Sequence, residues 1–304
     1  MVARNTADLQ DRAWEFNSHI GLMTRQVKKV DSASERIRSR VQGTQTIQRA
    51  SLLMRLLASR RRGGLRLADV VQDSGLEHST AHRILKGLMA EGLVMQDAES
   101  RRYLLGPLVY ELGLAAAPQF SLPDICRPSL QRIAEKTGDT VFLTTRSGND
   151  SVCIDRREGS FPIKTFTLDV GARRPLGAGA GGLALLMQLP EQAVEQIVCA
   201  NAARFAGYNN LSVPRLLKAL RRSRALGYAL NDIHNTTGAT TLGLPIVNRY
   251  GDPFAAISIG AIPSRMTDER QKELVSILRS EVRLIEKAMA GSARAAQFPV
   301  RPSV

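Results

Sequence analysis

Two separate stripes run along residues 79–88 when this segment is wound as an α-helix. The apolar stripe repeats at positions i, i+3, i+4 and i+7, the spacing that directs side chains toward a core, and consists of Ala81, Ile84, Leu85 and Leu88. The polar stripe consists of Ser79, His82, Arg83 and Lys86. Such a stripe suits contact with an anion, but taken alone it is also typical of a solvated surface.

The segments on either side of this helix favour the first interpretation. Residues 46–58 carry apolar residues at helical spacing, and residues 67–74 predict a short helix that ends at Gly75, where glycine can adopt the left-handed conformation. Residues 93–105 predict a β-hairpin with a polar turn and two arginines beside its tip. Three helices followed by a hairpin predict a winged helix-turn-helix.

A winged helix-turn-helix binds DNA by placing one helix in the major groove, which is wide enough for a single α-helix. The candidate DNA contacts lie on the polar stripe and beside the hairpin tip, and they are Ser79, Thr80, His82, Arg83, Lys86, Arg101 and Arg102. Arg83 suits a bidentate contact with a guanine edge, whereas Arg101 and Arg102 suit the adjacent backbone or minor groove. The sequence assigns no base to an individual side chain.

Residues 44–106 resemble the DNA-binding domain of the IclR family of bacterial transcriptional regulators, through the motifs at residues 75–83 and 91–94. The resemblance continues to about residue 290. Its later landmarks are residues 171–176, the glycine-rich turn that ends at Gly182, residues 227–229, Gly238 with Pro245, and residues 248–252.

The resemblance implies an α+β chain with a winged helix-turn-helix, a linker helix and a GAF-like α/β effector-binding domain built on an antiparallel sheet. The expected boundaries are a flexible basic N-terminal arm at 1–43, the DNA-binding domain at 44–106, the linker helix at 107–122, the effector-binding and oligomerisation domain at 123–291, and a flexible tail at 292–304. The arm suits either phosphate contacts or a solvated tail. Met23 is an alternative start, since nothing before it resembles the family.

In the family the linker helix helps to pair subunits. We therefore expect a homodimer or a tetramer made of two dimers, because a two-fold symmetric protein matches a two-part operator. The expected partners are double-stranded operator DNA and a small-molecule effector, and no membrane.

The remainder of the chain alternates between strand and helix patterns. The predicted strands lie at 141–143, 151–154, 161–168, 240–247 and 255–262, and the predicted helices at 130–138, 183–189, 194–199, 214–225 and 268–289. Turn-forming residues at 147–150 and 249–252 indicate hairpins and hence an antiparallel sheet.

The glycine-rich turn at 177–182 precedes a helix, so backbone N–H groups at that helix start can approach a carboxylate. In family members that bind small organic acids, this turn and the later strands form the effector pocket. The positions that match by motif are Ala180, Gly181, Thr241, Leu242, Ser258 and Gly260. Alternatively, the small residues only allow the helix and the sheet to pack closely.

The chain departs from the family pattern in this region. Gly177 stands where histidine is common in the family, Gly179 where serine or threonine is common, and Leu183 where lysine is common. His234 stands where a carboxylate is common, and Gly260 lacks a hydroxyl that some members use. We therefore expect a roomier, less polar cavity that suits an aromatic or branched carboxylic acid. The alternative is a ligand-independent DNA-binding scaffold with a vestigial pocket.

The same turn matches the G-x-G-x-x-G pattern of nicotinamide-dependent oxidoreductases, which is a remote alternative. That fold needs a buried parallel strand immediately before the glycines. Residues 171–175 contain two arginines and a proline, which are poorly suited to a central strand.

Composition sets outer limits on the class of protein. Lys and Arg number 42 against 28 Asp and Glu, giving a net charge of +14, which favours association with polyanions but locates no site. We expect a cytoplasmic chain, because no apolar run approaches a membrane span or a signal-peptide core. Cys126, Cys153 and Cys199 are expected to be reduced thiols. Neither a metal motif nor a catalytic constellation is recognisable, so we expect no cofactor and no enzyme.

Overall fold

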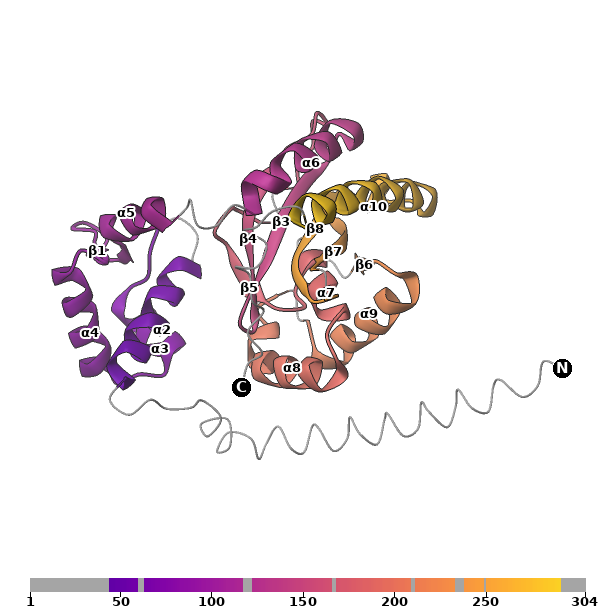
Figure 1. The fold of residues 1–304 in the computed structure, drawn as a ribbon. Coiled ribbons are helices and arrows are strands. Elements are labelled where there is room, and N and C mark those ends of the chain that lie inside the picture. The colour runs from indigo at the N-terminus through magenta and orange to yellow at the C-terminus, as the bar shows by residue number, and fades with distance from the viewer. Residues whose placement is uncertain are drawn as a thin grey trace, which may run out of the picture. The chain divides into compact units, whose positions relative to one another are not determined.

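The computed structural model describes residues 44–59, 63–116, 122–165, 168–208, 211–232, 238–248 and 250–290. The predicted N-terminal arm, the C-terminal tail and His234 lie outside these ranges. Within them, an N-terminal group of helices with a hairpin is followed by a C-terminal α/β group (Figure 1).

The N-terminal group forms the predicted winged helix-turn-helix. Its elements are α2 (Gln45–Ser59), α3 (Leu67–Ser74), α4 (His78–Ala90), β1 (Val94–Gln96) and β2 (Tyr103–Leu105). Helix α3 ends where Gly75 adopts a φ of +66° and donates its N–H to the carbonyl of Val71, which leaves room for the tight turn into α4. The helices pack on a small core that contains Leu53, Leu57, Val70, Ala81, Leu85, Leu88, Val94 and Tyr103.

The linker helix α5 (Pro107–Ala116) differs from the other described α-helices because none of its residues is buried. Tyr110, Leu112 and Leu114 are 69%, 54% and 56% exposed. Several large apolar side chains on one exposed helix indicate a surface that another element covers.

The C-terminal group is built on a six-stranded sheet in which every neighbouring pair is antiparallel. Its strands are β3 (Thr140–Ser147), β4 (Asp150–Arg157), β5 (Arg173–Pro175), β6 (Ala229–Asn231), β7 (Thr240–Val247) and β8 (Pro253–Ala261), and their order is β5-β4-β3-β8-β7-β6. A two-residue turn at Gly148 and Asn149 joins β3 to β4, with Ser147 opposite Asp150. The antiparallel sheet predicted from the sequence is confirmed.

Helices cover both faces of this sheet (Figure 1). Helices α6 (Leu122–Thr137) and α10 (Asp268–Ala290) pack on one face, where they bury alternate strand residues that include Val141, Leu143, Leu242, Leu244, Ile257 and Ile259. Helix α7 (Ala180–Met187) packs on the other face and is buried along its whole length, with α8 (Glu191–Phe205) and α9 (Val213–Leu226) nearby. None of the helices within the described ranges is long and apolar enough to cross a membrane.

An ion pair between a half-exposed arginine and a buried glutamate joins α6 to α10. Nη2 of Arg132 lies 2.6 Å from Oε2 of Glu281, whose side chain is only 3% exposed. Burial alone would raise the pKa of Glu281, but hydrogen bonds from Arg132 and Ser129 outweigh it and hold that pKa below its usual value.

Two details of the predicted secondary structure are wrong. Residues 161–165, the described start of the predicted strand at 161–168, form no strand, because Pro162 lacks an N–H and the Thr165 hydroxyl bonds instead to the carbonyl of Gly260. Helix α6 begins at Leu122 rather than near residue 130, since Pro123 lies in the first turn, where a proline costs no hydrogen bond. The short strands β5 and β6 were not predicted.

Candidate functional site

The exposed side of α4 carries the predicted polar stripe. Ser79, Arg83 and Lys86 are exposed, and Thr80 and His82 are half-buried. The opposite side packs Ala81, Leu85 and Leu88 into the core. Because these core contacts fix the rotation of α4 about its axis, its cationic side chains remain on the exposed side. The geometry suits insertion into a groove of about the width of one helix.

The two arginines of the hairpin differ in their surroundings. Arg101 is exposed and has a φ of +58° at the end of a turn in which Asp97 accepts two hydrogen bonds from Ser100, at 2.7 and 2.6 Å. These bonds lower the pKa of Asp97. Arg102 is half-buried and donates from Nη1 to the carbonyl of Gly64 at 3.1 Å, so it holds the hairpin against the segment before α3.

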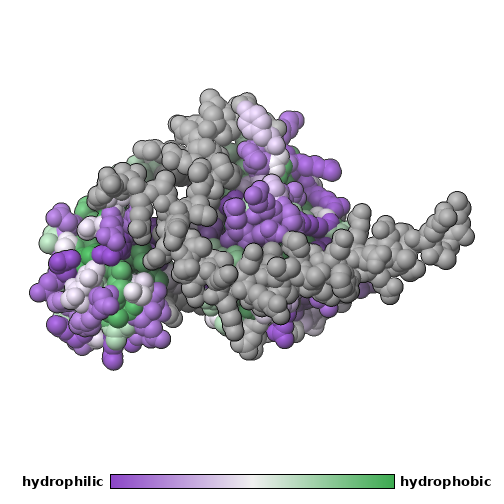
Figure 2. Space-filling model, turned by 90° about the horizontal axis from the view of Figure 1, so that it is seen from below, coloured by the Kyte–Doolittle hydropathy of each residue, from purple (hydrophilic) through white to green (hydrophobic). Residues whose placement is uncertain are grey.

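A groove of about 350 Å³ between α2 and α4 adds a residue that the sequence analysis missed. Arg49 and Thr46 from α2 line it together with Thr80 and Arg83 from α4. The helical spacing of α2 predicted only which of its apolar residues are buried. It gave no reason to place Arg49 near Arg83, because that proximity depends on how α2 packs against α4. The face of the molecule seen in Figure 2 shows a mostly hydrophilic surface on the N-terminal group, broken by an apolar band.

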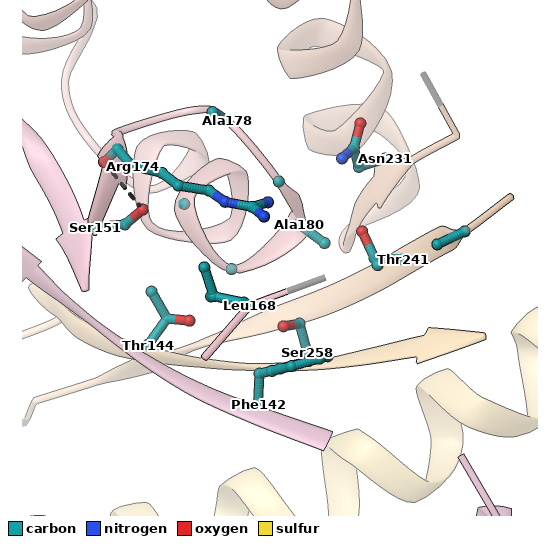
Figure 3. A pocket seen from close by; sticks show the side chains of 14 residues that line it. Phe142, Thr144, Ser151, Leu168, Arg174, Ala178, Ala180, Asn231, Thr241 and Ser258 are labelled. Atoms are coloured by element: carbon teal, nitrogen blue, oxygen red, sulfur yellow. Dashed lines mark hydrogen bonds between the residues drawn. The ribbon is translucent and has the colours of Figure 1, made fainter. Parts of the chain in front are cut away.

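A cavity lies between the sheet and the first turn of α7 (Figure 3). Its lining consists of Phe142, Thr144, Ser151, Leu168, Arg174, Ala178, Gly179, Ala180, Gly181, Gly182, Asn231, Ala239, Thr241 and Ser258. The free space inside it is about 30 Å³, enough for about one water molecule. Of the predicted effector-binding residues, Ala180, Gly181, Thr241 and Ser258 line this cavity.

The other two predicted residues do not line it. The Leu242 side chain is fully buried in the core on the opposite face of the sheet, because consecutive strand residues point to opposite faces and Thr241 takes the cavity side. The carbonyl of Gly260 accepts a hydrogen bond from Thr165 at 2.7 Å, and a Cβ at Gly260 would lie 2.9 Å from that hydroxyl oxygen. Gly260 therefore lies on the same face of the sheet as Ser258, beside the cavity lining rather than within it.

The cavity is more polar than the sequence analysis expected. Arg174, Thr144, Ser151 and Asn231 contribute polar groups that were not predicted. These polar groups and the free space of about 30 Å³ give no support to the expected roomier, less polar cavity. Strand alternation and the pairing of Phe142 with Ser258 would have placed Thr144 on the cavity side, but only once the register of β3 against β8 was known.

Three hydroxyl groups in this lining have no hydrogen-bond partner within the described residues. Thr144 is 2% exposed and Ser258 is 5% exposed, and the Oγ1 atom of Thr241 is buried. Buried hydroxyls are almost always hydrogen-bonded, since an unpaired one costs about 1–3 kcal/mol. Their convergence on one cavity is therefore typical of a binding site for a polar molecule.

Glycine is required where α7 begins. Gly177 and Gly179 have φ values of +101° and +89°, a region that other residues rarely adopt. The turn directs the backbone N–H groups of Ala180, Gly181 and Gly182 away from the helix body, and within the described residues none of them donates to an acceptor outside α7. The start of α7 thus carries a positive partial charge beside the cavity.

The alternative interpretation of the glycine-rich turn, as a dinucleotide-binding motif, does not fit the fold. A dinucleotide-binding turn follows a buried parallel strand, whereas β5 is a three-residue edge strand that pairs antiparallel with β4. Within the described ranges no three His, Cys, Asp or Glu side chains are placed to hold a metal ion. Burial raises the pKa of the Cys126 and Cys153 thiols to about 12, which keeps both unreactive.

Comparison with known proteins identifies the family of both domains. Residues 46–98 match the model of the IclR helix-turn-helix domain, and residues 115–287 match the model described as bacterial transcriptional regulator IclR C-terminal. The HTH-type transcriptional repressor AllR of Salmonella typhi is 31% identical over 237 residues, which cover 77% of this chain and 86% of AllR.

Solved structures share the fold. The crystal structure of the Thermotoga maritima IclR matches with a TM-score of 0.55 and 25% identity, covering 80% of this chain and 98% of that one. An IclR homologue from Microbacterium hydrocarbonoxydans complexed with 4-hydroxybenzoate matches with a TM-score of 0.60 and 22% identity, covering 81% of this chain and all of that one.

Proposed function

Because the chain belongs to the IclR family of bacterial transcriptional regulators, we propose that it controls transcription by binding operator DNA through α4 and the β1–β2 hairpin, and that a small organic acid in the cavity modulates this binding. The chain is a DNA-binding regulator and not an enzyme. The curated relatives are named as repressors, so we propose repression as its mode of action.

The main support for the proposal is that α4 has one buried apolar side and one exposed polar side. Its buried residues fix the helix in the core, so that Ser79, His82, Arg83 and Lys86 are presented together on the exposed side. We assign Arg83 and Lys86 to base edges or nearby phosphates, and Ser79 and Thr80 to phosphates beside the helix start. Arg101, at the exposed tip of the hairpin, suits a phosphate of the adjacent backbone.

The proposed effector site is the cavity beneath α7. The buried, unpartnered hydroxyl of Thr241 argues against a vestigial pocket, because a site that had lost its ligand would gain stability by replacing it with an apolar group. A protein of the same fold holds 4-hydroxybenzoate, an aromatic carboxylate. A molecule of that size requires this cavity to open beyond its present free space.

We propose that α5 pairs two subunits, since its apolar side chains are exposed within the described part of the chain. Two subunits then present two α4 helices to two operator half-sites. An effector that favours one of two subunit arrangements would change the affinity for DNA with a coupling of about 1–3 kcal/mol. We place the protein in the cytoplasm, where it reaches the chromosome.

Selection from a randomised duplex pool tests the proposal. We expect the full chain to enrich one sequence motif with two-fold symmetry, and Arg83→Ala to enrich a motif with weaker preference at some positions. A pool that shows no enrichment with the wild-type chain would refute sequence-specific binding. Light scattering on the same preparation measures whether the chain is a monomer, a dimer or a tetramer.

A further inference from the structure

Two of the four histidines of the chain lie one helical turn apart on α4. His78 is the first residue of the helix and is exposed, and His82 is half-buried. Their ring centroids lie 6.5 Å apart and their ring planes differ by 29°, so the rings stack along the helix. Residues at i and i+4 of an α-helix point in nearly the same direction. The two imidazoles therefore form a pair on one side of α4.

This pair has the spacing with which a helix chelates a transition-metal ion. In H-E-x-x-H sites, two histidines four residues apart bind zinc from one face of a helix. A zinc–nitrogen distance of about 2.1 Å brings the two ring centroids to roughly 5 Å from each other. Rotation of the exposed His78 side chain closes the observed 6.5 Å to that spacing. Ser79 stands where such sites carry the catalytic glutamate, so this pair suits metal binding and not hydrolysis.

The nature of the ligands decides which metals suit the pair. Imidazole nitrogens suit zinc, copper and nickel, whereas magnesium and calcium prefer oxygen ligands. No third His, Cys, Asp or Glu joins the pair within the described ranges, so water completes the coordination of a bound ion. A site with two protein ligands is also the reason that the sequence showed no metal motif, because such motifs supply three or four ligands.

The pair lies on the helix that the proposed function assigns to the groove of DNA. His82 belongs to the polar stripe together with Arg83 and Lys86. A bound divalent ion engages His82 and adds two positive charges and its water ligands to this side of α4. Added charge attracts every phosphate backbone alike, whereas bulk on this side of the helix hinders contacts with base edges. A metal ion here should therefore reduce discrimination between DNA sequences.

We propose that His78 and His82 together bind one divalent transition-metal ion, with Zn²⁺ as the probe, and that the bound ion lowers the preference of the chain for its operator over random duplex. The first part concerns the two side chains alone and is independent of the proposed function. The second part rests on the proposed function, because it assigns α4 to the DNA.

Calorimetric titration of the full chain with Zn²⁺, without DNA, tests the first part. The parent chain carries Cys199→Ser throughout, because Cys199 is an exposed thiol and thiolates also bind zinc. We expect one Zn²⁺ per chain. His78→Ala and His82→Ala should each weaken binding by about tenfold or more, since each leaves the metal with a single protein ligand.

The matched control is the double variant His19→Ala and His234→Ala, which removes the other two histidines and should leave Zn²⁺ binding intact. Melting curves without metal check that each variant is folded. A parent chain that binds no Zn²⁺, or binding that His78→Ala leaves unchanged, would overturn the first part.

Competition between a duplex from the region upstream of the chain's own gene and a random duplex tests the second part. We expect saturating Zn²⁺ to lower the ratio of the two affinities by about tenfold in the parent chain, the loss of roughly one good base contact. The ratio should not change in His78→Ala, which removes no proposed DNA contact. A ratio that Zn²⁺ leaves unaltered in the parent chain, or lowers equally in His78→Ala, would overturn this part. A parent chain with no preference even without metal would refute the proposed function and the second part together, but not the first.

Discussion

A Cβ atom at Gly181 would lie 2.7 Å from Oγ1 of Thr144, a distance that side chains do not tolerate. The first turn of α7 therefore packs directly on β3, with no side chain between them. This contact places the start of the helix and the hydroxyls of the strands around one cavity. The cavity exists in its present form because residue 181 has no side chain.

Gly181→Ala should therefore separate α7 from β3. We expect a loss of stability of about 1–3 kcal/mol from overpacking, together with a loss of the effector response. Denaturant unfolding measures the first effect, and the ligand-induced melting shift measures the second. Gly207→Ala is the control, because its Cβ would meet only the Arg204 carbonyl at an ordinary 3.6 Å. Equal behaviour of the two variants would contradict the packing described for α7.

The two hairpin arginines should give different phenotypes. Arg101→Ala should weaken binding to all duplexes and reduce the slope of log affinity against log salt by roughly 0.9, without changing stability. Arg102→Ala should also lower the melting temperature, since it removes the hydrogen bond to Gly64. Salt titrations of duplex binding, combined with melting curves, distinguish these results. An unaltered melting temperature for Arg102→Ala would show that this bond contributes little.

Arg83 and Arg49 line the same groove but are expected to read different features of DNA. Arg83→Ala should reduce discrimination between preferred and random duplexes by about 1–3 kcal/mol, whereas Arg49→Ala should weaken both to the same extent. Competition binding with the two duplexes measures the ratio. If Arg83→Ala weakened both duplexes equally, its assignment to base contacts would be wrong.

If the exposed apolar residues of α5 pair two subunits, a charge introduced among them should weaken the dimer. Leu112→Glu should place a charge in the proposed subunit contact and raise the dimer dissociation constant at least tenfold. Light scattering across a concentration series checks this. Glu111→Gln serves as the neighbouring control, since it changes an exposed residue without adding charge. A dimer equally stable in both variants would exclude α5 as the pairing element.

The pair formed by Arg132 and Glu281 predicts a dependence of stability on pH. Because the pKa of Glu281 is lowered in the folded state, its stabilising contribution is present above its unfolded pKa and is lost as the pH falls through the folded value. Arg132→Met should cost about 1–3 kcal/mol at pH 7. That cost should shrink as the pH falls below the ordinary pKa of a glutamate. Urea unfolding across this range tests the sign, and a cost that grows in acid would contradict it.

The helices of the N-terminal group could be predicted because their signals are local. Apolar spacing along α4 and the glycine after α3 depend on neighbours within two turns of helix. The residues of the cavity depend instead on contacts between distant segments. Arg174 lies opposite Ser151 only through the pairing of β4 with β5. Strand β5 was not predicted, because a proline such as Pro175 is unfavourable within a strand.

Strand alternation explains the remaining errors at the site. Thr241 and Leu242 are consecutive, so only one of them can face the cavity, and a motif match alone does not say which. The unpartnered state of the Thr144 hydroxyl also has no sequence signal, since it reflects the absence of an acceptor in three dimensions. Such features require the register of β3 against β8, which the sequence does not contain.

The most direct measurement is the affinity of the full chain for a labelled duplex from the region upstream of its own gene, in competition with random duplex, across a range of salt concentrations. A preference of roughly a thousandfold or more over random DNA, retained as salt increases, is the predicted result. Equal affinity for both duplexes, falling together with salt, would contradict sequence-specific regulation and leave only the attraction of a basic protein for a polyanion.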